Sequence, residues 1–135
     1  RKIIILFMIF LFIFPTNSLG KEINCPNPEN LVMTTEKDKE ELVEALNEIV
    51  PKIYGDSPDH EEWNIEMIEP MTSLSDSEDV YYQIAVTFCG KEVADHSWFV
   101  RLRFPRLLPA ESASLGELFI VKDKSDKWFA WFQYH

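Results

Sequence analysis

Apolar and polar residues alternate through much of the second half of the chain, and this pattern constrains the fold more than any other feature. The alternation covers residues 80–88 and 98–104, and a weaker version covers residues 63–67. Successive side chains of a β-strand point to opposite faces of a sheet, so a period of two predicts half-buried strands. Two further apolar runs, residues 117–122 and 127–134, flank a polar turn and predict a hairpin. The pattern therefore indicates an antiparallel sheet.

One stretch of helical periodicity precedes these strands. Thr34 and Thr35 are residues that commonly cap helices, and an apolar stripe at helical spacing follows them. The stripe consists of Leu42, Val43, Leu46, Ile49, Val50 and Ile53. Pro51 lacks an N–H and clashes with the preceding turn, so we expect the helix to end or kink there. The order predicts an α+β domain in which the N-terminal helix packs on a curved antiparallel sheet of about four to five strands.

This order of elements resembles the cystatin-like and NTF2-like group of folds over residues 34–135. The resemblance is architectural, because no diagnostic motif accompanies it. The inhibitory loop of cystatins reads Gln-x-Val-x-Gly, whereas this chain has Gln83, Ala85 and Thr87 at the corresponding positions, inside a predicted strand. The resemblance therefore does not imply inhibition of cysteine proteases, and a fold by itself does not define a function.

Residues 1–20 predict a secretory signal peptide. Two cations precede an apolar run at residues 3–14, and Pro15 ends that run. Ser18 and Gly20 are the small residues expected before a cleavage site, so we expect cleavage after Gly20. The run is shorter than the roughly 20 apolar residues that a membrane-spanning helix needs. We therefore predict a secreted protein; an uncleaved signal, the alternative, would anchor it to a membrane.

Acidic residues outnumber basic residues by 23 to 13. The excess lies in residues 21–80, which hold 17 acidic and 4 basic residues, whereas residues 81–135 hold 6 and 7. Binding to nucleic acid or to an anionic membrane surface needs a basic face, so we predict neither partner. After signal removal, we expect residues 21–33 to form an extended segment and residues 34–135 to form a single domain.

Cys25 and Cys89 are the two cysteines of the chain. In an exported protein, a disulfide between them is the default expectation, and it would join the N-terminal segment to a central strand. The alternative makes Cys89 a nucleophile and His96 its base. That alternative rests on two residue types alone.

No sequence motif indicates a catalytic or cofactor-binding site. His60 and His96 each follow an aspartate, but their surroundings do not match the two-histidine helical pattern of zinc sites. A glycine-rich phosphate loop and a serine nucleophile elbow are also lacking. We therefore predict no catalytic residue, no metal and no other cofactor. The competing hypothesis is a small enzyme or ligand carrier with a hollow between helix and sheet, lined by Tyr82 and Trp98 and served by His96.

The strand faces that point away from the predicted helix carry aromatic and arginine side chains. They are Phe99, Arg101, Arg103, Phe119, Phe129 and Trp131. Such side chains are enriched at protein interfaces. If this face is open, we expect self-association into a homodimer, with a peptide or a glycan as the next candidate partner. In the alternative, the loop 105–115 or the N-terminal segment covers it.

The sequence thus predicts a small secreted, non-enzymatic binding domain. Two alternatives stay open at this point. One is a ligand-binding or hydrolase/isomerase-type domain with a pocket between helix and sheet, and the other is an exported structural or stress-related protein.

Overall fold

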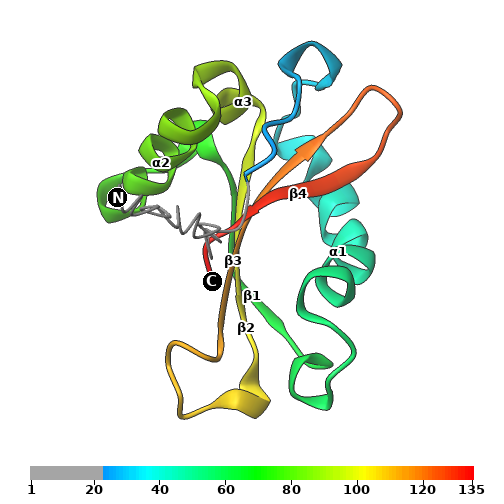
Figure 1. The fold of residues 1–135 in the computed structure, drawn as a ribbon, viewed down its shortest axis with the longest axis vertical. Helices are drawn as coiled ribbons and strands as arrows, with labels where there is room; N and C mark the ends of the chain where they lie inside the picture. Colours follow the sequence, from blue (N-terminus) through cyan, green and yellow to red (C-terminus); the bar gives the residue numbers. More distant parts are fainter. Residues whose placement is uncertain (1–22) are drawn as a thin grey trace, which may run out of the picture.

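The structure, a computed structural model, describes residues 23–135 (Figure 1). The predicted signal peptide lies outside the described residues. Within them, the chain forms a four-stranded antiparallel sheet in the order β1-β2-β3-β4, so consecutive strands are also neighbours in space. The strands are β1 (Asn64–Pro70), β2 (Trp98–Arg103), β3 (Leu115–Lys122) and β4 (Trp128–Gln133). The predicted α+β class and the antiparallel sheet are confirmed.

Helix α1 (Lys39–Tyr54) covers one face of the sheet (Figure 1). A short 3-10 turn leads into it, and Thr35 caps that turn by accepting a hydrogen bond from the Lys37 N–H at 3.4 Å. Four residues of the predicted apolar stripe are buried against the sheet, and Ile53 packs beside them partly buried. The core on this side contains Leu42, Leu46, Ile49, Val50, Trp98, Val100, Leu102, Phe104, Leu118, Ile120 and Trp128.

Pro51 does not end the helix at its own position. Helix α1 continues to Tyr54 and stops at Gly55, whose φ of 85° lies in a region that favours glycine. The Gly55 N–H donates to the Pro51 carbonyl at 2.9 Å. The expected end of the helix is therefore displaced to the turn that follows the proline.

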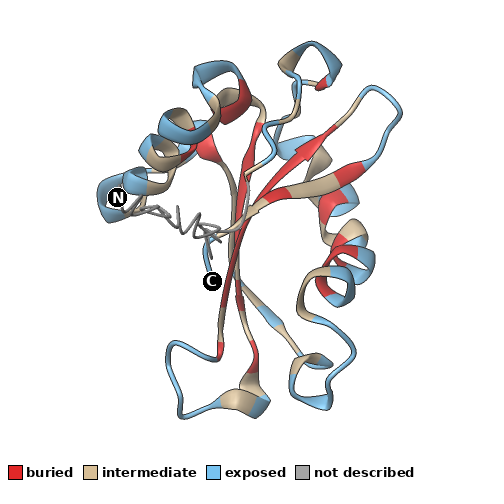
Figure 2. Cartoon of the chain, viewed as in Figure 1, coloured by how far each residue is buried: buried red, intermediate tan, exposed pale blue. Residues whose placement is uncertain are grey.

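Helices α2 (Asp79–Cys89) and α3 (Lys91–His96) cover the opposite face of the sheet (Figure 1). The predicted strand at residues 80–88 is therefore wrong, and so is the expectation that one helix alone covers the sheet. Residues 80–88 are mostly apolar, so they fit a helical period as well as a period of two. Tyr81, Ala85 and Cys89 lie on successive turns, and Ala85 is fully buried. Buried residues accordingly lie on both sides of the sheet (Figure 2).

A β-bulge in β4 changes which side chains face which helix. Phe119 pairs with Phe132, but the next residue of β3, Ile120, pairs with Ala130, which leaves Trp131 as the extra residue. Strict alternation would place Phe132 on the α1 side together with Ala130. The bulge instead moves Phe132 to the α2 side, where it packs with Phe119 at a ring-centroid distance of 5.0 Å.

Cys25 and Cys89 form a disulfide, as predicted. Cys89 is the last residue of α2 and not part of a central strand, so the bond ties the N-terminal segment to the end of a helix. Beyond the disulfide, Leu31 is buried, and the Val32 N–H donates to the Lys122 carbonyl at 2.9 Å. The segment that was expected to be extended is thus attached to the domain at two places, with a 3-10 turn at Pro28–Asn30 between them.

Replacing both Cys25 and Cys89 with serine is expected to lower the free energy of unfolding by about 2–4 kcal/mol. The bond joins residues 64 positions apart, and closing so long a loop restricts the unfolded chain. Urea unfolding of the double variant measures the loss, and wild-type protein in reductant should lose the same amount. A loss below about 1 kcal/mol in both samples would contradict this entropic account.

Candidate functional site

The predicted aromatic–arginine face is not open. Phe99 and Phe119 are fully buried, and Trp131 is 8% exposed. Phe129, which is partly buried, packs against the same cluster beneath α2 and α3. The expectation of an exposed interface on this face is therefore wrong. The loop 105–115 is not the cover, whereas Leu31 and Ile23 of the N-terminal segment do contribute to it.

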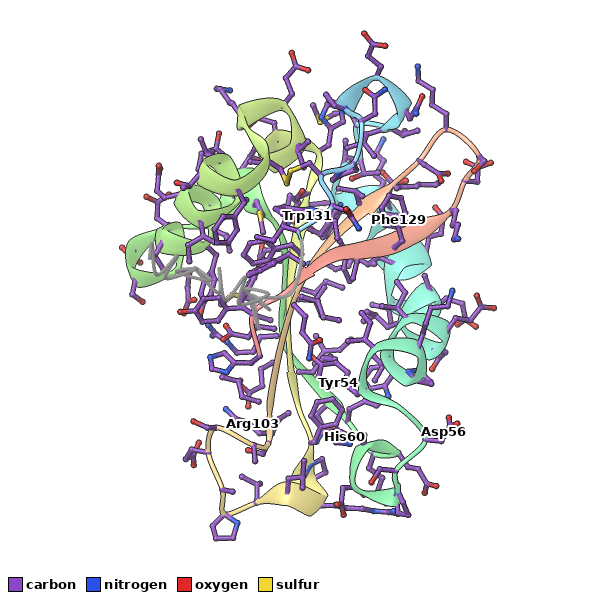
Figure 3. All side chains as sticks on the ribbon, viewed as in Figure 1. Tyr54, Asp56, His60, Arg103, Phe129 and Trp131 are labelled. Carbon is purple, nitrogen blue, oxygen red and sulfur yellow. A yellow bond between two sulfur atoms is a disulfide. The ribbon has the colours of Figure 1, made fainter. Side chains whose placement is uncertain are left out.

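The two arginines of the predicted face are paired within the chain. Arg101 contacts Glu78 at 2.8 Å and the buried Glu117 at 3.2 Å. Arg103 contacts Glu66 at 2.7 Å and lies on the side of the sheet opposite Tyr54 (Figure 3). The hydrogen bonds that Arg101 donates to Glu78 are the main reason that the pKa of Arg101 is raised. These guanidinium groups therefore hold the acidic first half of the chain to the sheet and are not free for a partner.

A groove of about 550 Å³ opens at the edge of this covering layer. It lies where the N-terminal segment meets the turn after β1 and the helices α2 and α3; we call it the tether groove, because the disulfide tethers that segment. Its apolar wall is formed by Met33, Pro70, Met71, Leu74 and Trp98, and its charged and hydroxyl groups come from Thr34, Thr72, Asp79, Tyr82, Lys91, Asp95 and Ser97.

Local hydrogen bonds hold the walls of the tether groove in place. The Trp98 indole N–H donates to Thr34 Oγ1 at 2.6 Å, which fixes the N-terminal segment against β2. The Met71 N–H donates to the Ser97 carbonyl at 2.9 Å. Lys91 and Asp95 lie four residues apart on α3, so their side chains share one face of that helix. The groove is therefore built from elements that are fixed to the sheet.

Two side chains of the tether groove donate hydrogen bonds to Asp95. The Tyr82 phenol donates to Asp95 Oδ1 at 2.7 Å, and Lys91 Nζ donates to Asp95 Oδ2 at 2.6 Å. The bond from Lys91, with a smaller contribution from Tyr82, lowers the pKa of Asp95. The Asp95 carboxylate raises the pKa of Tyr82 and that of Lys91. All three shifts favour the ionised aspartate, the neutral phenol and the charged ammonium.

This arrangement suits binding better than proton transfer. A general acid or base works best when its pKa lies near the operating pH. The shifts at Asp95, Tyr82 and Lys91 move each pKa away from neutrality. The cluster therefore offers fixed charges and one phenol to a ligand.

His96 does not serve the groove that Tyr82 and Trp98 line. His96 is the last residue of α3, and its Nδ1 lies 2.6 Å from the Glu92 carbonyl oxygen one turn earlier. It is not part of the groove lining. Cys89 is bonded to Cys25, which rules out the thiol nucleophile that pairs with His96 in the alternative interpretation. The structure thus places Tyr82 and Trp98 in one groove, but His96 does not line that groove.

His60 packs in an aromatic cluster at the end of α1. Its ring lies beside that of Tyr54 (Figure 3), with the ring centroids 5.7 Å apart, and 4.7 Å from that of Phe104. Among residues 23–135, no group of three or more His, Cys, Asp or Glu side chains is placed to hold a metal ion. His60 therefore has a packing role in the described structure.

A second groove of about 390 Å³ lies between α1 and the β3–β4 hairpin. Trp128 forms part of its wall, and the indole nitrogen of Trp128 is buried without a hydrogen-bond partner in the described structure. The charged residues of this groove are balanced in sign: Glu48 and Asp126 against Lys52 and Lys127. It lacks the hydrogen-bonded charged cluster of the tether groove, which is the stronger candidate site.

Sequence reasoning missed the Lys91–Asp95 pair. With strands predicted at residues 80–88 and 98–104, residues 91–96 serve only to connect them, and this assignment hides the four-residue spacing that places two side chains on one helical face. Had residues 91–96 been assigned to a helix, this spacing would have indicated the pair.

Compared with known protein families, characterised proteins and solved structures, the chain matches none of them. Its function must therefore be inferred from its own residues. Within residues 23–135, no helix has the length and apolar character needed to cross a membrane.

Proposed function

We propose that the protein is a small exported domain that binds a ligand in the tether groove. The observation that carries this proposal is the groove itself: about 550 Å³, walled by apolar side chains, with Tyr82, Lys91 and Asp95 hydrogen-bonded at one place. Ligand sites are typically concave and largely apolar, with a few converging polar groups that orient the ligand. The proposal shares Tyr82 and Trp98 with the pocket-bearing alternative, but its groove lies beside α2 and α3 and not between α1 and the sheet, and His96 does not line it.

Export is part of the proposal. The Cys25–Cys89 disulfide supports it, since such bonds persist in oxidising compartments, and the predicted signal peptide gives the route. The finer likeness to cystatin-like and NTF2-like domains remains a prediction and carries no part of the argument.

Fragment screening by NMR tests the site. With isotope-labelled protein, we expect fragments to shift amide resonances that cluster at Thr72, Leu74, Tyr82 and Asp95. Thr72 is exposed and lines the groove, so Thr72→Trp should fill the groove and remove the shifts without disturbing the core. Thr87 is exposed on α2 outside the groove, and Thr87→Trp is the matched control that should keep them.

The outcome that counts against the proposal is equally specific. Fragments that shift only residues of the groove between α1 and the hairpin, or shifts that persist in Thr72→Trp, would move the binding site elsewhere.

A further inference from the structure

The tether groove carries more negative than positive charge. Asp79 and Asp95 are the carboxylates of its lining, and Lys91 is its lysine. Asp79 is exposed at the start of α2, and in the part of the chain that the structure describes its carboxylate makes no hydrogen bond or ion pair. Asp79 lies three residues before Tyr82 on α2, and the Tyr82 phenol donates to Asp95, so both carboxylates line the groove beside the same phenol. One ligand cation can therefore interact with the two carboxylates together.

Lys91 neutralises Asp95 only weakly. The Lys91 side chain is 74% exposed, whereas that of Asp95 is 23% exposed. Ion pairs between residues four apart on an exposed helix are weak, because water and salt screen them. A ligand cation that displaces the Lys91 ammonium returns it to water at little cost, and gains contact with Asp79 as well as Asp95.

Apolar side chains lie beside these carboxylates. Met33 is 59% exposed, and Leu74 and Pro70 continue the wall from the turn after β1. Methionine side chains adapt their shape to a bound apolar group. A small inorganic cation would leave this wall uncovered, whereas the aliphatic stem of a lysine or arginine, together with a neighbouring apolar residue, would cover it.

The charge of the rest of the domain favours the same kind of ligand. Arg101, Arg103 and Arg106 are paired with glutamates, and Lys122 is paired with Glu41. The formal net charge of the chain is −10. An acidic field of this kind attracts cationic ligands and raises their association rate.

From this combination we propose that the tether groove binds a basic peptide segment, with a lysine or arginine of the peptide between Asp79 and Asp95 and an adjacent apolar residue against Met33 and Leu74. This inference rests on the proposed function and names the class of its ligand.

Calorimetric titration with three matched peptides tests the inference. The sequence Gly-Ser-Leu-Lys-Met-Ser-Gly, with blocked ends, is compared with versions in which glutamine or glutamate replaces the lysine. The lysine peptide is expected to bind at least about tenfold more tightly than the glutamine peptide, because it adds charge-assisted hydrogen bonds. The glutamate peptide is expected not to bind. Added salt should lower the affinity of the lysine peptide more than that of the glutamine peptide.

Three variants locate the cation. Asp79→Asn and Asp95→Asn should each lower the affinity for the lysine peptide by about three- to tenfold and leave the affinity for the glutamine peptide unchanged. Lys91→Gln removes the competing ammonium, so it should strengthen binding of the lysine peptide. Glu44→Gln, an exposed acid on α1 at the opposite face of the sheet, is the control and should change neither peptide.

The failures of the two proposals are distinguishable. Equal binding of the lysine and glutamine peptides would overturn the cationic ligand and leave the groove as a binding site. The cationic ligand would also be overturned if Lys91→Gln bound the lysine peptide more weakly than the wild type does. The same holds if the wild type bound the glutamate peptide more tightly than the lysine peptide. Either result would point to an anionic ligand. If neither peptides nor fragments reach the groove, the proposed function itself fails.

Discussion

Replacing Phe119 with alanine is expected to lower the free energy of unfolding by about 3–5 kcal/mol. Phe119 lies at the centre of the layer beneath α2. Its ring is fully buried and contacts the rings of Tyr81, Phe99, Trp131 and Phe132. Truncation would leave a cavity that a sheet packed on both faces cannot easily close. Because domains of this size are stable by only about 5–15 kcal/mol, the loss is a large fraction of the total.

Urea unfolding followed by tryptophan fluorescence measures this loss. Tyr134→Ala is the matched control: Tyr134 is 48% exposed, so its truncation should cost no more than about 1 kcal/mol. If Phe119→Ala unfolds completely, Phe119→Leu keeps most of the volume and should still unfold measurably earlier. If Phe119→Ala were as stable as Tyr134→Ala, we would conclude that Phe119 lies on an exposed face, as the alternation in the sequence predicts.

Replacing Arg101 with methionine is expected to destabilise the fold by about 3–5 kcal/mol, because it removes one partner of a buried ion pair. The Glu117 side chain is 1% exposed, and Arg101 Nη2 lies 3.2 Å from its carboxylate. His135 also lies near Glu117, with its Nε2 3.5 Å from Glu117 Oε1. Without Arg101, the Glu117 carboxylate loses its guanidinium partner and stays buried.

The double variant Arg101→Met with Glu117→Leu separates the pair from its surroundings. Replacing both charges with apolar groups of similar size should recover most of the stability lost in Arg101→Met, because no uncompensated charge remains. Glu78→Gln serves as the control: Glu78 also pairs with Arg101, but its side chain is 24% exposed, so we expect a loss of about 1 kcal/mol or less. A double variant no more stable than the single one would show that Arg101 acts through packing alone.

The sequence predicted the parts of the fold that depend on local pattern. Leu42, Leu46, Ile49 and Val50 of the predicted stripe lie on a helix and are buried, and the run from residue 98 to residue 103 is a strand. The cysteines are bonded as expected. Each of these patterns has one simple solution, because a stripe at helical spacing or a lone pair of cysteines leaves few alternatives.

Residues 80–88 show where local pattern is insufficient. Apolar residues are so dense there that both a strand and a helix can bury most of them, and the alternation of Val80, Tyr82 and Ile84 favoured the strand. The helix leaves Val80 52% exposed and buries Ala85. Tertiary packing makes the choice, because Phe99 and Phe119 on the second face of the sheet need a cover. That one misassignment produced the predicted exposed face.

The candidate site was predictable only in fragments. Tyr82 and Trp98 were expected to line a hollow, and both line the tether groove. Lys91 and Asp95 went unnoticed because their pairing depends on α3, which begins directly after the Gly90 turn. Met33 and Thr34 reach the groove only because the N-terminal segment returns to the sheet, held by the disulfide and by the hydrogen bond from Trp98.

The sequence by itself thus determined the α+β class, the amphipathic helix that covers one face, and the cysteine pair. These follow from residue spacing and from the chemistry of one residue type. Only the tertiary structure decided that α2 and α3 cover the second face, that Arg101 and Arg103 pair with the acidic half, and that a groove opens beside the tethered segment. Those outcomes depend on contacts between residues distant in the chain, and the burial energy that selects them is shared across the whole sheet.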